Sequence, residues 1–185
     1  MNLVARAKAI LMTPKQEWGV IDSEPLNVAE LLSGYVLPLV AIGAIARFIG
    51  LSMIGLAGFR ISIGMGIEMA ITSFILSVIG VFVLAWVINA LAPTFGATQG
   101  MPQAIKLSAY SMTAAWVAAI FYVLPFLGIL ALVGALYSLY LFFLGLPILM
   151  KVPADKVVAY AVVVIVACIV VFWIIGTIVG RMTYM

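Results

Sequence analysis

Three charged residues next to apolar segments are the strongest candidates for chemistry in this sequence: Arg47, Arg60 and Glu68. Glu68 lies at the start of a long apolar run, and an ionisable residue in or near a membrane segment is a functional-site hypothesis by default. Arg47 lies near the end of the preceding run, at a similar depth by helix rise. The group could form a gate or proton site, or an interfacial ion pair that fixes the first hairpin. We favour the ion pair, with Arg60 nearby on the connecting loop.

A second group of candidates consists of hydroxyl-bearing residues in two later apolar segments. Residues three or four positions apart share one face of a helix, so these hydroxyls could line a small cavity. In membrane helices such groups more often bond the backbone or a neighbouring helix, for about 1 kcal/mol each, and we favour that interpretation. The residues are Ser108, Tyr110, Ser111, Thr113, Tyr137 and Tyr140.

The residue types that are missing exclude most catalytic chemistry. The sequence has no His and a single Cys, Cys168. His-based acid–base catalysis, Cys–His pairs, the usual zinc sites and an internal disulfide are therefore excluded. No phosphate-binding loop of the GxxxxGK[ST] kind is present. We expect no enzyme activity, no cofactor and no bound metal.

The composition places these residues in a membrane. Of 185 residues, 67% are hydrophobic and 8% are charged, whereas a soluble domain is about half apolar and about a quarter charged. Nine Lys and Arg with six Asp and Glu cannot solvate the surface of a chain of this size. A water-soluble fold is therefore excluded.

Five continuous apolar runs are long enough to cross a bilayer, which takes about 20 residues in a helix. Barrel strands would alternate apolar and polar residues, so the fold class we predict is all-α, a polytopic membrane protein with five transmembrane helices. Pro38 and Pro147 lie inside the first and fourth runs, and each removes a backbone donor and predicts a kink. The runs cover residues 31–51, 67–91, 106–123, 126–150 and 157–179.

The residues before the first run form a short N-terminal arm. Apolar residues recur at helical spacing over residues 3–11, which predicts a short amphipathic helix on the membrane surface. Trp18 is expected in the headgroup region. We therefore divide the chain into an interfacial arm, 1–30, and a five-helix transmembrane domain, 31–185.

The orientation follows from Lys and Arg in short loops. A cytoplasmic N-terminus places six of the nine basic residues inside and three outside, so we predict this orientation, with an external C-terminus. The basic residues are scattered and form no single patch. The expected partner is the lipid bilayer, and no nucleic acid is expected.

Four segments carry a resemblance to a known family. In their order they resemble the Yip (Ypt/Rab-interacting protein) family of integral membrane proteins, and in particular its bacterial, YohC-like branch. The resemblance implies five transmembrane helices, a cytoplasmic N-terminus and a place in the bacterial inner membrane. The segments are Pro14-Lys15-Gln16-Glu17-Trp18 with Ile21 and Glu24, Leu32 to Leu39, Ala104 to Ser111, and Leu144 to Pro153 with Asp155 and Lys156.

Eukaryotic members of that family bind prenylated Rab-type GTPases. This sequence shows no long cytoplasmic domain ahead of Pro14 and no DLYGP motif. Met112 also follows Ser111 at a position where the family often has Pro. GTPase binding is therefore not expected of this chain.

Two functions remain open. The first is a non-enzymatic membrane protein that organises the membrane or recruits a cytoplasmic partner through its arm and loops. The alternative is a small transporter or channel that uses a polar site around Arg47, Glu68, Tyr110 and Thr113. Because five helices enclose little space, such a transporter is expected to be a homo-oligomer.

Overall fold

The computed structural model describes residues 2–56 and 59–183, and this part of the chain is helical, with no β-strand. Within it, five helical segments are long and apolar enough to cross a membrane, which confirms the predicted all-α, five-span fold. Each begins within about five residues of its predicted start. The segments are Val28–Ile54, Ile63–Phe95, Met101–Val123, Pro125–Met150 and Val157–Ile174.

Two short helices, α1 (Leu3–Met12) and α2 (Pro14–Ser23), form the N-terminal arm. The side chain of Asn2 caps α1 by accepting a hydrogen bond from the Ala5 backbone at 3.1 Å. Pro14 starts α2, where its missing N–H costs nothing. Trp18 is wholly buried against the bundle, so its predicted place among the headgroups was wrong.

The first span joins α3 (Val28–Leu31) and α4 (Leu37–Phe48) through a π-helical turn, Leu32–Val36, and ends in a second one, Ile49–Ile54. Pro38 lies in the first turn of α4. It lacks a backbone N–H and crowds the preceding turn, and a π-helical turn is one way in which a helix accommodates such a break. Pro38 therefore coincides with a change of helical winding within a continuous span.

The second and third spans are α5 (Ile63–Leu91), which continues into a 3₁₀ turn at Ala92–Phe95, and α6 (Met101–Ser111) with α7 (Thr113–Ala118). The third span ends in a 3₁₀ turn, Ala119–Val123. Met112 separates α6 from α7, so the third span is broken near its middle.

The fourth and fifth spans are long helices. A short 3₁₀ turn, Pro125–Leu127, leads into α8 (Ile129–Met150), and α9 (Val157–Thr183) follows. Pro147 lies inside α8, three residues before its end. Lys151 ends α8 in the left-handed conformation, with φ 52°.

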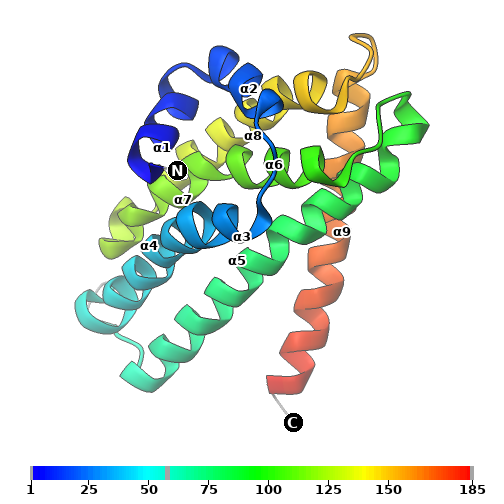
Figure 1. Cartoon of the computed structure of the whole chain (residues 1–185). Helices are drawn as coiled ribbons and strands as arrows, with labels where there is room; N and C mark the ends of the chain where they lie inside the picture. The colour runs from blue at the N-terminus through cyan, green and yellow to red at the C-terminus, as the bar shows by residue number, and fades with distance from the viewer. Residues whose placement is uncertain (1, 57–58, 184–185) are drawn as a thin grey trace.

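The helices form three layers, which can be followed in Figure 1. α4 and α5 form one outer layer, and α6, α7 and α8 form the middle layer, in contact with both α4 and α5. The arm forms the third layer, because α2 packs on α8 and α1 packs on α7. The middle layer is therefore covered by protein on two sides.

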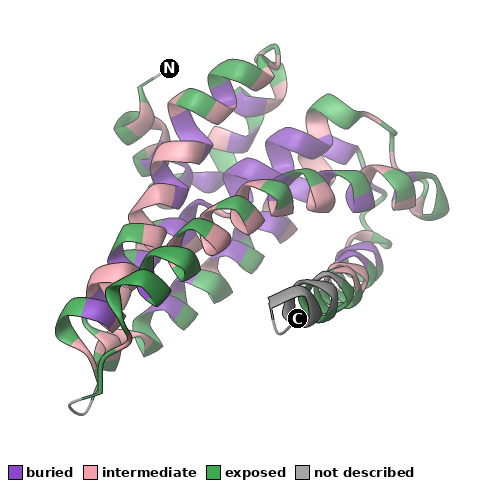
Figure 2. Cartoon of the chain, turned by 90° about the horizontal axis from the view of Figure 1, so that it is seen from below, coloured by how far each residue is buried: buried purple, intermediate pink, exposed green. Residues whose placement is uncertain are grey.

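Burial follows this layering. Figure 2 shows buried residues between the helices and exposed residues on the outer surface. The third span has the largest buried share of the five, and also the lowest mean hydropathy. The fifth span is attached mainly by its first part, where Tyr160, Ala161 and Val164 are buried and the Tyr160 hydroxyl donates to the Ile88 carbonyl.

An apolar groove of about 800 Å³ lies between α5, α8 and the middle of α9, and residues around the break between α6 and α7 also line it. Ser73, Ser77, Ser111 and Ser138 are the polar residues of its lining. The groove holds no charged residue. It therefore offers packing space, and the Cys168 thiol is the one titratable group of its lining.

Candidate functional site

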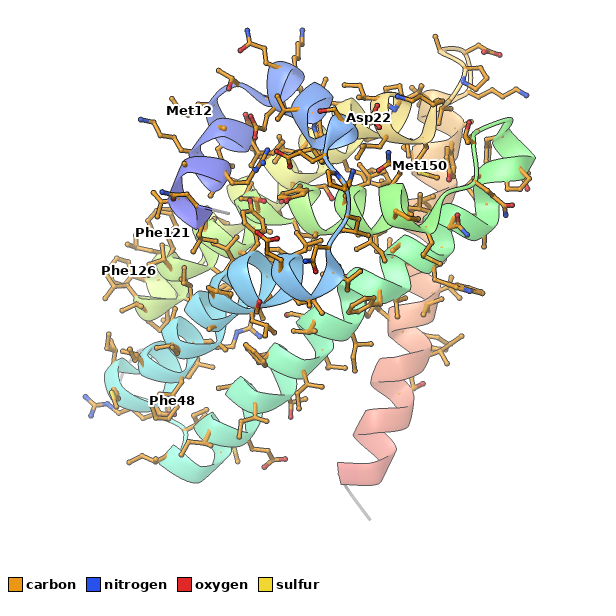
Figure 3. All side chains as sticks on the ribbon, in the orientation of Figure 1. Met12, Asp22, Phe48, Phe121, Phe126 and Met150 are labelled. Carbon is orange, nitrogen blue, oxygen red and sulfur yellow. The ribbon has the colours of Figure 1, made fainter. Side chains whose placement is uncertain are left out.

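A polar cavity of about 580 Å³ lies between the arm, the start of the first span and α6. It is at the end of the molecule that carries Asp22 and Met150, opposite the end that carries Phe48 (Figure 3). Both cations and carboxylates reach it, in a chain that has few of either. Its charged and aromatic lining residues are Arg6, Glu17, Glu24, Glu30, Lys106 and Tyr110.

Arg6 is the cation on the arm side of the cavity. It lies on the inward face of α1, and its guanidinium forms ion pairs with Glu17 and Glu24 while it lies over the Tyr110 ring, 5.9 Å from the centroid. Burial by itself lowers the pKa of Arg6, but the hydrogen bond and negative charge of Glu24 outweigh it, so the pKa is raised above its ordinary value. Arg6 is therefore a permanent positive charge that joins α1, α2 and α6.

Lys106 is the cation on the bundle side, and it is almost fully buried in α6. Its ammonium donates to the carbonyl oxygens of Ile21, at 2.9 Å, Asp22, at 3.5 Å, and Glu24. The last carbonyls of a helix have no partner within the helix and attract cations. Lys106 therefore caps the C-terminal end of α2 from another part of the chain.

Asp22 joins the arm to two other segments at this end. One carboxylate oxygen accepts from the Gln103 amide at 2.9 Å, and the other pairs with Lys151. The Thr98 backbone donates to the Met150 carbonyl at 2.8 Å, which ties together the two loops that flank this junction. The arm, the loop before α6 and the loop after α8 therefore form one continuous surface.

A buried aromatic and hydroxyl cluster lies next to the cavity, where Tyr110 belongs to both. The hydroxyls of Tyr35 and Thr113 are 2.8 Å apart, and the rings of Tyr35 and Tyr110 are 4.9 Å apart. Thr113 also donates to the Tyr110 carbonyl at 2.7 Å. These three residues link the first span to the break in the third.

The structure brings some of the predicted hydroxyl residues together and separates others. Ser108 and Ser111 donate to carbonyls of their own helix, at Ala104 and Ser108, so they bond the backbone. Tyr137 donates to the Leu11 carbonyl of the arm at 2.7 Å and lies against Tyr140, with the ring centroids 5.4 Å apart. Of the six predicted hydroxyl residues, only Tyr110 lines the polar cavity.

The three charged residues named first lie elsewhere. Arg47 packs over the Tyr122 ring, 4.8 Å from the centroid. Arg60 donates from Nε to the Ile54 carbonyl at 3.2 Å, and Glu68 is exposed on α5. In the part of the chain that the structure describes, no ion pair joins any two of them.

Sequence reasoning missed Arg6, Lys106, Asp22 and Tyr35. One signal for Arg6 was present, because positions 3, 6, 7 and 10 share one helical face. Lys106 was placed at the very start of the third run and counted only toward the orientation, although it lies well inside the third span. No local pattern pairs Lys106 with Ile21, which is 85 residues away in sequence.

The described fold and its charged cavity define a polytopic α-helical membrane protein whose N-terminal arm is packed on the transmembrane helices. The family model of the Yip1 domain matches residues 8–175, which covers the second half of α1, all of α2 and the five spans. The chain therefore belongs to the Yip1 family. Among curated proteins and solved structures, none matches this chain.

Proposed function

We propose that this Yip1-family chain is a non-enzymatic protein of the bacterial inner membrane that recruits a cytoplasmic partner on the surface formed by its arm and two loops. The observation that carries the proposal is the junction at Asp22, which ties α2 to α6 through Gln103 and to the loop after α8 through Lys151. Three segments far apart in sequence are thereby held in fixed positions. A fixed surface of this kind is suited to binding another protein, because less has to be ordered on association.

The charges at this end support the same proposal. Arg6 and Lys106 are occupied by groups of the chain itself, so they serve to hold the arm. Ser23, Thr98 and Gln99 are exposed around the junction and leave polar contacts available on the outside. We call this exposed region, at residues 22–24, 96–100 and 151–156, the junction surface.

The test is site-specific photocrosslinking in intact membranes. A crosslinker at Gln99, on the junction surface, is expected to capture a discrete protein, whereas one at Met53, an exposed residue at the other end, is not. Asp22→Ala is expected to lower the yield at Gln99 while membrane insertion stays unchanged. No discrete product at Gln99, or an equal product at both positions, would argue against recruitment.

The orientation belongs to the same proposal, with the junction surface in the cytoplasm. Its support is the excess of Lys and Arg on the arm and loops at this end and the five spans, which place the two termini on opposite sides. Reporter fusions within the loop at Gln99 and after Met185 are expected to report the cytoplasm and the external side, respectively. The reverse pattern would place the junction surface outside and rule out a cytoplasmic partner.

A small transporter is the second candidate, because Tyr110 and Thr113 do lie together beside a polar cavity. Its site would be smaller than the one proposed from the sequence, since neither described cavity is lined by Arg47 or Glu68. Flux assays in proteoliposomes test it. Thr113→Val would reduce flux and Glu68→Gln would not, whereas an absence of flux in the unmodified protein removes this candidate.

A further inference from the structure

The outward face of α1 carries a stripe of apolar and basic side chains. Val4, Lys8 and Met12 follow one another at four-residue spacing, so they share one face of the helix. Val4 and Met12 are 73% and 72% exposed, and Lys8 is exposed between them. Lys15 is exposed at the start of α2, three residues after Met12. We call Val4, Lys8, Met12 and Lys15 together the outer stripe.

The carboxylates of the arm are turned away from the outer stripe. Glu17 and Glu24 pair with Arg6, and Asp22 pairs with Lys151. Among the described residues, Lys8 and Lys15 take part in no ion pair. The arm has equal numbers of acidic and basic side chains over residues 1–24, but its three carboxylates are all in ion pairs, which leaves these two exposed lysines as its uncompensated charges. The outer stripe is therefore positive.

The helix that carries most of the outer stripe packs directly on two of the membrane spans. The Leu11 carbonyl, one residue before Met12, accepts a hydrogen bond from Tyr137, which is inside the fourth span. α1 itself packs on α7, a part of the third span. A helix packed on two spans, with its outer face uncovered by other described residues, is in a position to meet the bilayer, and exposed apolar side chains next to lysines suit the boundary of headgroups and acyl chains.

We propose that the outer stripe binds anionic phospholipid, with Lys8 and Lys15 on the phosphate and carboxylate groups of the lipid and with Val4 and Met12 inserted between acyl chains. The positive charges of Lys8 and Lys15 favour anionic over zwitterionic lipid, because a zwitterionic headgroup has no net charge to attract them. Each lysine near an anionic surface contributes about 1 kcal/mol, roughly a fivefold change in occupancy.

The test uses the full-length chain with Cys168→Ala and Met12→Cys, reconstituted in nanodiscs of phosphatidylcholine alone or of phosphatidylcholine with phosphatidylglycerol. The readout is the rate at which a water-soluble maleimide labels position 12. We expect labelling to be slower by about fivefold or more in the anionic discs. High salt is expected to remove most of the difference, because exposed charges are screened.

Three matched variants make the result specific. Lys8→Gln with Lys15→Gln is expected to abolish the dependence on lipid charge, whereas Lys156→Gln, a loop lysine outside the arm, is expected to leave it intact. A cysteine at exposed Thr98 reports whether lipid charge changes labelling in general. Circular dichroism and gel filtration check that each variant is folded.

Equal labelling of position 12 in both kinds of disc overturns the proposal, as does a lipid dependence that survives the double lysine variant. Protection that appears only when a soluble acidic protein fraction is added, equally in both discs, would assign the stripe to a protein and would likewise overturn it. Met12→Cys, Lys8→Gln and Lys15→Gln lie outside the junction surface, and the two controls within it, at Thr98 and Lys156, are used only in the labelling assay, so this proposal and the recruitment proposal can fail separately.

Discussion

Trp18 lies directly against the backbone of Gly145: a Cβ added at Gly145 would be 2.7 Å from the indole Cε2 of Trp18 and 2.7 Å from Cδ1 of Leu107. Trp18 is completely buried, although it belongs to the arm. Both residues lie in segments that resembled the Yip family in the sequence. Two of the segments that carry the resemblance, distant in sequence, therefore meet in one contact between α2 and α8.

This contact predicts that Gly145→Ala destabilises the docked arm. The new methyl group must displace a ring or a leucine in a filled site, and overpacking of this kind costs about 1–3 kcal/mol. Thermal unfolding in detergent, followed by tryptophan fluorescence, measures the loss. Gly64→Ala is the control, because a Cβ there meets nothing within 4 Å. Equal shifts for the two variants would show that the fit of Trp18 is looser than described.

Lys106→Met is expected to loosen the arm without removing it. The substitution leaves the carbonyls at the end of α2 without their cation, and hydrogen bonds from a charged group contribute about 2 kcal/mol in total. Limited trypsin digestion reports the loosening, since Lys8 and Lys15 are arm cleavage sites. Lys156→Met removes an exposed lysine of a loop and should leave the rate of cleavage at Lys8 and Lys15 unchanged. A Lys106→Met protein that resists trypsin as well as the parent does would show that the cap is dispensable.

The pair Tyr35 and Thr113 is expected to couple the first span to the third. A double-mutant cycle with Tyr35→Phe and Thr113→Val isolates their mutual hydrogen bond, because the bond from Thr113 to the Tyr110 carbonyl cancels in the cycle. Interhelical hydrogen bonds in membranes contribute about 0.6 kcal/mol on average. Unfolding in detergent of the two single variants and the double variant gives the coupling energy. Additive effects would mean that the two hydroxyls do not cooperate.

The far end of the molecule supplies a contrasting prediction. Arg47→Gln should cost at least about 0.5–1 kcal/mol, because the half-buried guanidinium packs over the Tyr122 ring and such contacts are stronger where the cation is less solvated. Glu68→Gln should change stability by less than about 0.5 kcal/mol, because Glu68 is exposed. Thermal unfolding of both variants distinguishes the stacking contact from the predicted ion pair. A large and equal loss in both would restore the ion pair that the sequence suggested.

The five spans could be predicted because a membrane helix requires a continuous apolar run, which is visible in the sequence. The prediction for Trp18 was wrong, because a tryptophan near a membrane segment favours the headgroup region unless another helix provides a site that buries it. That buried site depends on Gly145, more than 120 residues later in the sequence. A local pattern contains no information about such a partner.

The candidate site was predicted only in part for the same reason. Helical spacing grouped Tyr110 with Thr113, and these two do lie together. Arg6 was left out because its charge argued for an exposed position, whereas Glu17 and Glu24 allow it to be buried. Lys106 was treated as a topology signal, and its role as a cap on α2 depends on the three-layer packing.

The third span, which has the lowest mean hydropathy of the five and the largest buried share, has a consequence for biogenesis. Domains form from the N-terminal end as the chain is synthesised, so the arm emerges long before Lys106 arrives to hold it. In turn, the third span contains a buried lysine whose hydrogen bonds go to carbonyls of the arm. The arm is therefore synthesised before the residue that holds its C-terminal end, and its docking on α6 has to wait until the third span has been made.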